Sequence, residues 1–184
     1  MHPIPYDRHY IPKPAGPASL GKVLIVPHVP GMLKAETMAA VERSYEAYFT
    51  FPLKWDDPYQ YAELFRQVWD WPVDTLWIEQ DMVPTAAQIT DVLYCSHQWC
   101  TITYHQGGGM YTDGIGFAKF ASRLKTVWPN AGANISADPR GRERAVKWPS
   151  LNEQVENHLS RLGVAMHVHD GHVMHLHYPE PEHG

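Results

Sequence analysis

The feature that most constrains the fold is an alternation of short apolar runs with stretches of helical character in the first half of the chain. The run 22–27 is continuously apolar and ends in proline, which is typical of a strand buried on both faces. Two further strands and three helices follow at even spacing: strands 48–53 and 75–79, and helices 34–45, 58–69 and 84–94. This order predicts an α/β fold of three layers, with helices on both faces of a mainly parallel sheet.

The second half of the chain is predicted to complete the same domain. A chain of 184 residues fits one hydrophobic core, and we expect a single domain at 21–184 after an extended arm at 1–20. In order, we expect a strand, a helix, a long polar loop, a final helix and two short strands around Asp170-Gly171: 99–104, 117–127, 129–148, 151–162, 164–168 and 172–177.

Composition argues against several classes of protein. The net charge of -5 is unlike that of a generic nucleic-acid binder. No apolar run approaches the roughly 18–20 residues of a membrane span, and the first residues lack the apolar segment of a signal peptide. Cys95 and Cys100 are expected to be reduced thiols rather than part of a disulfide framework. We therefore expect a cytoplasmic protein with no membrane partner.

The strand at 75–79 runs directly into two acidic residues, Glu79 and Asp81, before Pro84 breaks the pattern. An unpaired buried carboxylate is costly, so buried strands rarely end in acidic residues that have no role. A strand-end aspartate is a hard oxygen ligand, suited to Mg²⁺ or Mn²⁺ shared with phosphate oxygens. The alternative is that Asp81 only caps the helix that follows.

Histidine is concentrated near the end of the chain, where seven of the twelve lie between residues 158 and 183. On a strand His175 and His177 share one face, as do His167 and His169. Imidazole is a good ligand for Mn²⁺ or Zn²⁺, so we predict that His175 or His177 approaches the cation held by Asp81. The alternatives are histidines bonded to the backbone of a hairpin and an incidental zinc-binding tail.

These features together resemble the glycosyltransferases of the GT-A fold: a first strand with a nucleotide-facing turn, a strand ending in acidic-x-Asp, and a histidine after a final helix–strand unit. The likeness covers roughly residues 22–178. The segments 77–81, 114–120 and 173–177 are also similar to small bacteriophage-encoded glycosyltransferase-like proteins. The resemblance implies a compact GT-A-like domain, in the host cytoplasm if phage-encoded. Its expected cofactor is Mn²⁺ or Mg²⁺, held by Asp81, His175 and His177.

The resemblance also implies a UDP- or GDP-linked sugar as donor. The segment Pro27-His28-Val29-Pro30-Gly31 would be the loop that meets the nucleotide. Glu79 stands where the family has an aspartate and would contact the ribose or the cation. Asp56 would contact the base or ribose, or else caps the next helix. Arg66 would reach the diphosphate, or else is a solvated charge on a helix.

The acceptor side is expected along the glycine-rich stretch. Gly108 and Gly114 permit close approach of the backbone to a sugar, and a hairpin without function is the competing interpretation. An inverting transferase needs an acidic base for the acceptor hydroxyl. Asn152 occupies a position where related enzymes would have an acidic residue. The candidate bases are Asp113, Glu153 and Glu156.

Positive charge gathers between residues 119 and 147, where seven Lys and Arg residues stand against two acidic ones. Such a patch suits a phosphate backbone, and flanking indoles could stack against a base flipped out of a duplex. We therefore expect a hydroxylated base in phage DNA as acceptor. The alternative is that the arginines bind the donor diphosphate or are solvated. The acceptor residues expected are Arg140, Arg142, Arg144, Trp128 and Trp148.

Two other classes of function remain open from the sequence. A metal-dependent nucleotidyl transferase or phosphohydrolase also uses strand-end carboxylates, but it would need further carboxylates to hold two ions. A non-enzymatic accessory protein with a histidine-rich, metal-binding tail is the third class.

Overall fold

The computed structural model describes residues 21–44, 46–54, 60–105, 111–131 and 148–176. None of the helices within these ranges is long and apolar enough to cross a membrane. The elements are β1 (Lys22–His28), α2 (Ala35–Arg43), β2 (Tyr48–Pro52), α3 (Gln60–Trp69), β3 (Asp74–Ile78), β4 (Met82–Val83), α4 (Ala86–Leu93), β5 (Trp99–His105), β6 (Tyr111–Thr112), β7 (Phe117–Phe120), α5 (Ser122–Val127), α7 (Trp148–Arg161) and β8 (His167–His175).

The α/β class is confirmed, but a mainly parallel sheet is wrong. The strand order is β2-β1-β3-β7-β5-β8-β4, with β6 paired to β5. Strand β1 is parallel to β2 and β3, as the alternating pattern predicts. Strand β7 then enters antiparallel between β3 and β5, and β4 pairs antiparallel with β8. The sheet is therefore mixed: β2, β1 and β3 form one parallel part, and β5 and β8 form a second parallel pair.

The insertion of β7 overturns the expected helix at 117–127. All four residues of Phe117–Phe120 are buried in the sheet, and only Ser122–Val127 are helical. In the sequence, the charged Lys119 among apolar residues is typical of the solvent-facing position of a surface helix. The structure instead buries its side chain, which is 2% exposed, and satisfies the ammonium with backbone carbonyls. The sequence predicts a helix here because a lysine that is buried and bonded to backbone carbonyls cannot be told from an exposed one in the sequence.

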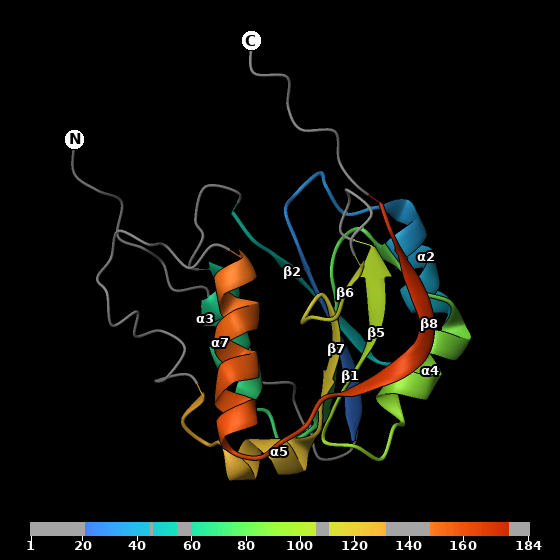
Figure 1. Cartoon of the computed structure of the whole chain (residues 1–184). Helices are drawn as coiled ribbons and strands as arrows, with labels where there is room; N and C mark the ends of the chain where they lie inside the picture. Colours follow the sequence, from blue (N-terminus) through green and yellow to red (C-terminus); the bar gives the residue numbers. More distant parts are fainter. Residues whose placement is uncertain (1–20, 45, 55–59, 106–110, 132–147, 177–184) are drawn as a thin grey trace, which may run out of the picture.

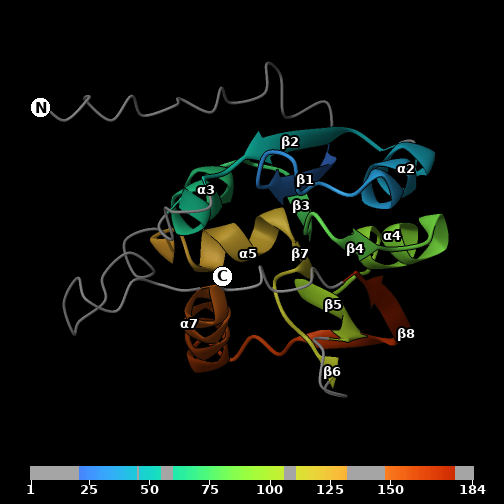
Figure 2. The ribbon, with the colours of Figure 1, turned by 90° about the horizontal axis from the view of Figure 1, so that it is seen from above.

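Two apolar clusters pack on opposite faces of the sheet, which makes three layers (Figures 1 and 2). Alternate residues of β1 enter the two clusters: Val23 and Ile25 face helices α3, α5 and α7, whereas Leu24 and Val26 face α2 and α4. The first cluster is rich in tryptophan. Trp69, Trp71, Trp77, Trp99 and Trp128 all belong to it.

The two short strands expected at the end of the chain are one strand, β8, and Asp170-Gly171 is a bulge rather than a turn. Ile102 of β5 pairs with His169, and its neighbour Thr103 pairs with His172. Gly171 takes a φ of 95°, a conformation that a bulge and a hairpin turn both require, which explains the wrong prediction. Because β8 does not reverse, it carries its histidines along the full length of β5.

Candidate metal and donor site

The carboxylates lie in a tight turn between β3 and β4. The Met82 amide donates to the Glu79 carbonyl at 3.0 Å, and the Glu79 amide donates to the Gly116 carbonyl at 2.9 Å. The Gln80 carbonyl accepts from the Thr37 hydroxyl at 3.0 Å. Contacts from the segment before β7 and from α2 thus fix the backbone of Glu79 and Gln80.

Helix α4 is capped by Thr85 and not by Asp81. The hydroxyl oxygen of Thr85 accepts from the Gln88 backbone amide at 3.2 Å. The Thr85 backbone amide in turn donates to the side-chain oxygen of Gln88 at 2.9 Å. This reciprocal capping satisfies the first turn of the helix. The alternative that Asp81 only caps the following helix is therefore wrong.

The structure brings Glu79, Asp81 and His175 together. One ligand atom from each lies within 4.8 Å of the others, and the two acidic residues are each 9% exposed. The Nε2 atom of His175 lies 3.1 Å from Oδ2 of Asp81. Ligands on adjacent vertices of an octahedral shell with bonds of about 2.1 Å lie about 3 Å apart, so this pair has the spacing that a hard cation needs.

The other ring nitrogen of His175 fixes its tautomer. Nδ1 lies 2.8 Å from the His105 carbonyl, which can only accept, so Nδ1 carries a hydrogen. A neutral ring would then turn the lone pair of Nε2 toward a carboxylate. Burial lowers the pKa of His175, but the bond and charge of Asp81 and the His105 carbonyl outweigh it and raise the pKa overall. The position thus favours a positive charge, either a proton on Nε2 or a cation beside it.

Backbone pairing holds His175 against the carboxylates. Met82 of β4 pairs with His175, and the Leu176 amide donates to the Asp81 carbonyl at 2.8 Å. The end of β8 is therefore bound to the same turn that presents Asp81, although 93 residues of chain lie between Asp81 and His175 in sequence.

Glycines let the backbone approach this cluster closely. A Cβ at Gly116 would lie 2.9 Å from the Glu79 carboxyl carbon, and one at Gly114 would lie 2.7 Å from the Tyr104 hydroxyl. Burial raises the pKa of Tyr104 and the charge of Glu79 raises it further, so the phenol stays neutral. Tyr104 is a neighbour of the carboxylates that sequence reasoning missed.

The loop after β1 lies beside the carboxylate turn. The Val29 amide donates to Oε1 of Gln80 at 2.6 Å, and Gly31 turns the chain with a φ of 82°. Pro27 is buried at the end of β1. Nδ1 of His28 is buried without a hydrogen-bond partner among the described residues. The segment from Pro27 to Gly31 is thus near Glu79 and Asp81, as a donor-binding loop would be.

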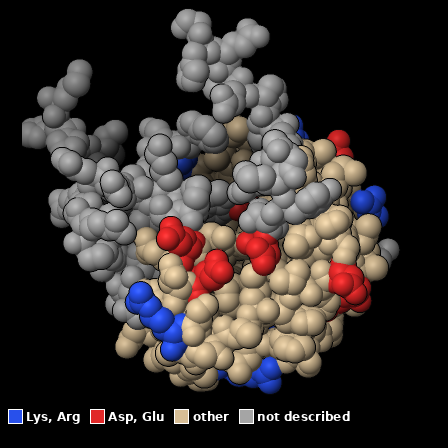
Figure 3. Space-filling model, in the orientation of Figure 1, with Lys and Arg blue, Asp and Glu red and all other residues tan. Residues whose placement is uncertain are grey.

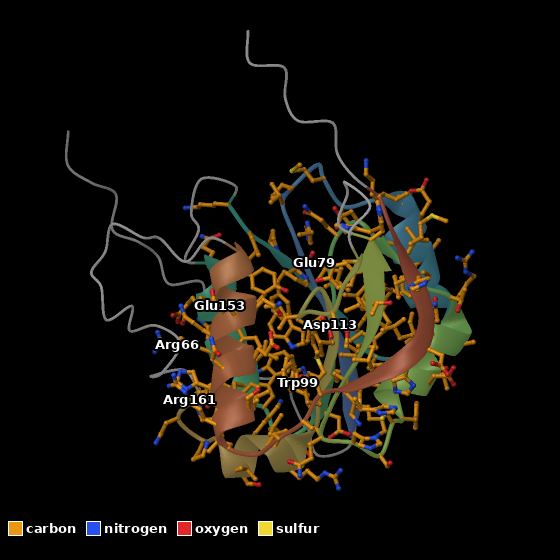
Figure 4. All side chains as sticks on the ribbon, in the orientation of Figure 1. Arg66, Glu79, Trp99, Asp113, Glu153 and Arg161 are labelled. Carbon is orange, nitrogen blue, oxygen red and sulfur yellow. The ribbon has the colours of Figure 1, made fainter. Side chains whose placement is uncertain are left out.

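The candidate bases differ in how they face this region. Glu153 and Glu156 are exposed on α7, whereas Asp113 is half-buried and its charge acts on the Tyr104 phenol. Asn152 accepts from the Ile115 amide at 3.0 Å. In Figure 4, Glu79 and Asp113 lie between helix α7 and strand β5. Figure 3 shows acidic side chains grouped on this face. Asp113 is therefore the better placed of the three.

Two residues expected at the donor or acceptor lie elsewhere. Arg66 forms an exposed pair with Glu63 at 3.0 Å on α3, the solvated arrangement given as its alternative. Trp128 is 4% exposed, and its ring packs against Trp69 at 5.2 Å between centroids. Its burial conflicts with stacking on a flipped base, so it is a core residue.

The expected basic patch is smaller than the sequence indicates. Lys119 is buried, and so is Lys125, whose Nζ donates to the carbonyls of Trp71 and Val73, both at 2.9 Å. Burial lowers the pKa of Lys125 to about 7, so it is a weak cation. Arg123 donates to the Ser96 carbonyl. All three side chains donate hydrogen bonds to backbone carbonyls. Lys119 and Lys125 are buried, so they cannot contact a phosphate at the surface.

Several predicted site residues cannot be placed. Trp148 is the first residue of α7, but its side chain is outside the described part of the molecule. The others lie outside the described residues: Asp56, Gly108, Arg140, Arg142, Arg144 and His177.

Comparisons with known proteins find similarity in structure alone. No protein-family model and no curated protein sequence matches the chain. A solved glycosyltransferase involved in glycosylation of the major capsid of PBCV-1 is similar over 81% of each chain, with 15% identity and a TM-score of 0.55. The solved protein A197 from STIV is similar over 81% of each chain, with 9% identity and a TM-score of 0.49. The chain therefore has a fold similar to that of a viral glycosyltransferase.

Proposed function

We propose that this chain is a metal-dependent glycosyltransferase of the GT-A type, which moves a sugar from a nucleotide-sugar donor to a hydroxyl acceptor. The observation that carries the proposal is the orientation of His175. Its Nδ1 is occupied by the His105 carbonyl, and its Nε2 faces Asp81 beside the buried Glu79. Donation from the second nitrogen to a carbonyl is the usual support of a metal-binding histidine.

The residues fit a hard divalent cation. Two carboxylates and one imidazole suit Mn²⁺ better than Mg²⁺, because nitrogen ligands favour the transition metal. A bound cation would supply positive charge that neutralises the leaving diphosphate. The acidic side chains grouped on this face in Figure 3 have the same requirement, since without a cation they would repel a diphosphate.

The chain's own groups would complete the transfer. The loop from Pro27 to Gly31 would bind the nucleotide beside the carboxylate turn, which it contacts through the Val29 amide and the Gln80 side chain. Asp113 would take the proton of the acceptor hydroxyl while the oxygen of that hydroxyl bonds to the anomeric carbon of the sugar. The bond from that carbon to the diphosphate oxygen breaks, and the nucleoside diphosphate leaves with the electron pair.

The acceptor class is proposed only as a hydroxyl compound. Burial of Lys119, Lys125 and Trp128 removes part of the support for a DNA acceptor. A hydroxymethylated base in DNA stays one acceptor to be tested. Hydrolysis by two ions is less well supported, because the metal cluster among the described residues has Glu79 and Asp81 as its carboxylates and Asp170 is exposed on β8.

The proposal is tested in two steps on the full chain. Thermal unfolding with a panel of nucleoside diphosphates should show stabilisation by UDP or GDP that requires Mn²⁺. Nucleotide-sugars are then offered with sugars, peptides, and hydroxymethylated or unmodified DNA, and products are weighed. Asp113→Asn should keep nucleotide binding and lose transfer, whereas the matched control Asp170→Asn should keep both. A wild-type chain that binds no nucleotide with any cation would contradict the proposal.

A further inference from the structure

A second group of metal-ligand side chains lies at the opposite end of the β5–β8 pair. Cys95, Cys100 and His169 place one donor atom each within 4.8 Å of one another, and so do Cys95, His97 and His167. Cys95 belongs to both sets. The register explains the meeting, because Cys100 pairs with His167 and Ile102 with His169, on the same face of the two strands.

The loop that carries Cys95 is held in place by cations from β7 and α5. Lys119 donates to the carbonyl of Cys95 and, at 3.3 Å, to that of His97. Arg123 donates to the carbonyl of Ser96 between them. The His97 amide lies 3.4 Å from the Cys95 sulfur as a donor. Such a bond stabilises a thiolate more than a thiol.

The surroundings favour a neutral His169 ring, as a metal ligand must be, but they also favour the protonated thiol of Cys100. Burial lowers the pKa of His169, and the neighbouring His167 lowers it further. Nε2 of His169 is buried and has no hydrogen-bond partner among the described residues. Burial raises the pKa of the Cys100 thiol, so a metal would have to displace its proton, and the charge of Lys119 assists in that direction.

We propose that Cys95, Cys100 and His169 bind a zinc ion, with His97 or His167 as fourth ligand. Thiolate and imidazole are the ligands of structural zinc sites. Neighbouring donors in a tetrahedral zinc shell lie about 3.3–3.8 Å apart, so the three donors within 4.8 Å of one another need only small side-chain movements. The fourth ligand, His97 or His167, lies within 4.8 Å of Cys95 and would have to swing toward the other two. The site is structural, because four protein ligands leave no position for a substrate.

This zinc site is separate from the carboxylate cluster and does not depend on the proposed function. Tyr104, which contacts His175, lies four positions along β5 from Cys100, a distance of about 13 Å on a strand. The ion would join the loop after α4 and the adjoining strand β5 to β8, which is distant from both in sequence. Its role is to hold the outer part of the sheet.

The test measures metal and thiols in the full chain, produced in zinc-containing medium without a polyhistidine tag. We expect about one zinc per chain by mass spectrometry and two thiols that react with a thiol reagent only after chelation. Replacement by Co²⁺ should give the charge-transfer absorption of thiolate bound to cobalt. Absence of zinc after purification and reconstitution, or a Cys95–Cys100 disulfide in its place, would overturn the proposal.

Matched variants assign the ion to this cluster. Cys95→Ser and His169→Gln should lose the zinc, as should Cys100→Ser. His172→Gln should retain it, because that ring is on the other face of β8 and contacts Thr103 at 2.7 Å. Asp81→Ala should also retain it. Cys100 is fully buried, so if its variant does not fold, Cys95→Ser and the cobalt spectrum decide. Zinc that is lost in Asp81→Ala and kept in Cys95→Ser would rule the site out.

Discussion

The two ends of strand β8 carry the same side chain but present it to different chemistry. At one end His175 faces Asp81 and Glu79, which are hard oxygen ligands. At the other end His169 faces the sulfur atoms of Cys95 and Cys100. The first group lies beside the loop after β1. The second group includes the loop after α4, whose backbone carbonyls accept hydrogen bonds from Lys119. The comparison shows that the partner atoms, and not the histidines, decide which metal each end suits.

Asp81→Ala gives the largest expected effect and should act on the carboxylate end alone. We expect Mn²⁺-dependent nucleotide binding to weaken by more than about a thousandfold, which is about 4 kcal/mol. Zinc content should not change. Calorimetry with UDP and GDP measures the first quantity and elemental analysis the second. Equal loss at both ends would show that the variant unfolds the strand rather than removes a ligand.

Cys95→Ser tests the converse case. In buffer with zinc far above its dissociation constant, the variant should lose about 3–4 kcal/mol of unfolding free energy relative to wild type. Without zinc the difference should shrink, because neither chain is then stabilised by the ion. Denaturant unfolding with and without a chelator measures both. Nucleotide binding should be unaffected, and a zinc-independent loss would point to packing instead.

Gly116→Ala should disturb the carboxylate end by crowding. The added Cβ would lie 2.9 Å from the Glu79 carboxyl carbon, which must move. Overpacking of this kind costs about 1–3 kcal/mol, and we expect a ten- to hundredfold loss in Mn²⁺ affinity. Titration with Mn²⁺ followed by electron paramagnetic resonance measures it. Gly116→Ala with unchanged affinity would mean that Glu79 does not contribute to the site.

Asp74→Asn should have the smallest effect, and it should depend on pH. Burial raises the pKa of Asp74, but the Ser122 amide at 2.7 Å and Lys22 at 3.1 Å lower it overall. A lowered pKa means stability that is present above the unfolded value, near 4, and is lost as pH falls through the folded value. We expect a small loss at pH 7, of at most about 1 kcal/mol as for a partly exposed ion pair, which shrinks as the pH falls below the unfolded value; urea unfolding measures it. A pH-independent loss would contradict this.

The sequence predicts the carboxylate end far better than the thiol end. Glu79 and Asp81 can be predicted from the sequence because they directly follow an apolar strand, and this pattern depends only on neighbouring residues and not on tertiary contacts. Pairing of His169 with the cysteines depends on the register of β8 against β5, including the bulge at Gly171. Tertiary contacts set that register, so no local pattern shows it. Strand β7 was missed because the polar Lys119 is buried and bonded to carbonyls.

The central claim is that Glu79, Asp81 and His175 hold a divalent cation together with a nucleoside diphosphate. The direct measurement is diffraction at the manganese absorption edge from crystals grown with Mn²⁺ and UDP or GDP. The account predicts an anomalous peak about 2.0–2.3 Å from Oδ2 of Asp81 and Nε2 of His175, with diphosphate oxygens on its open side. A saturated crystal with no peak there, in which His175 still bonds directly to Asp81, would contradict it.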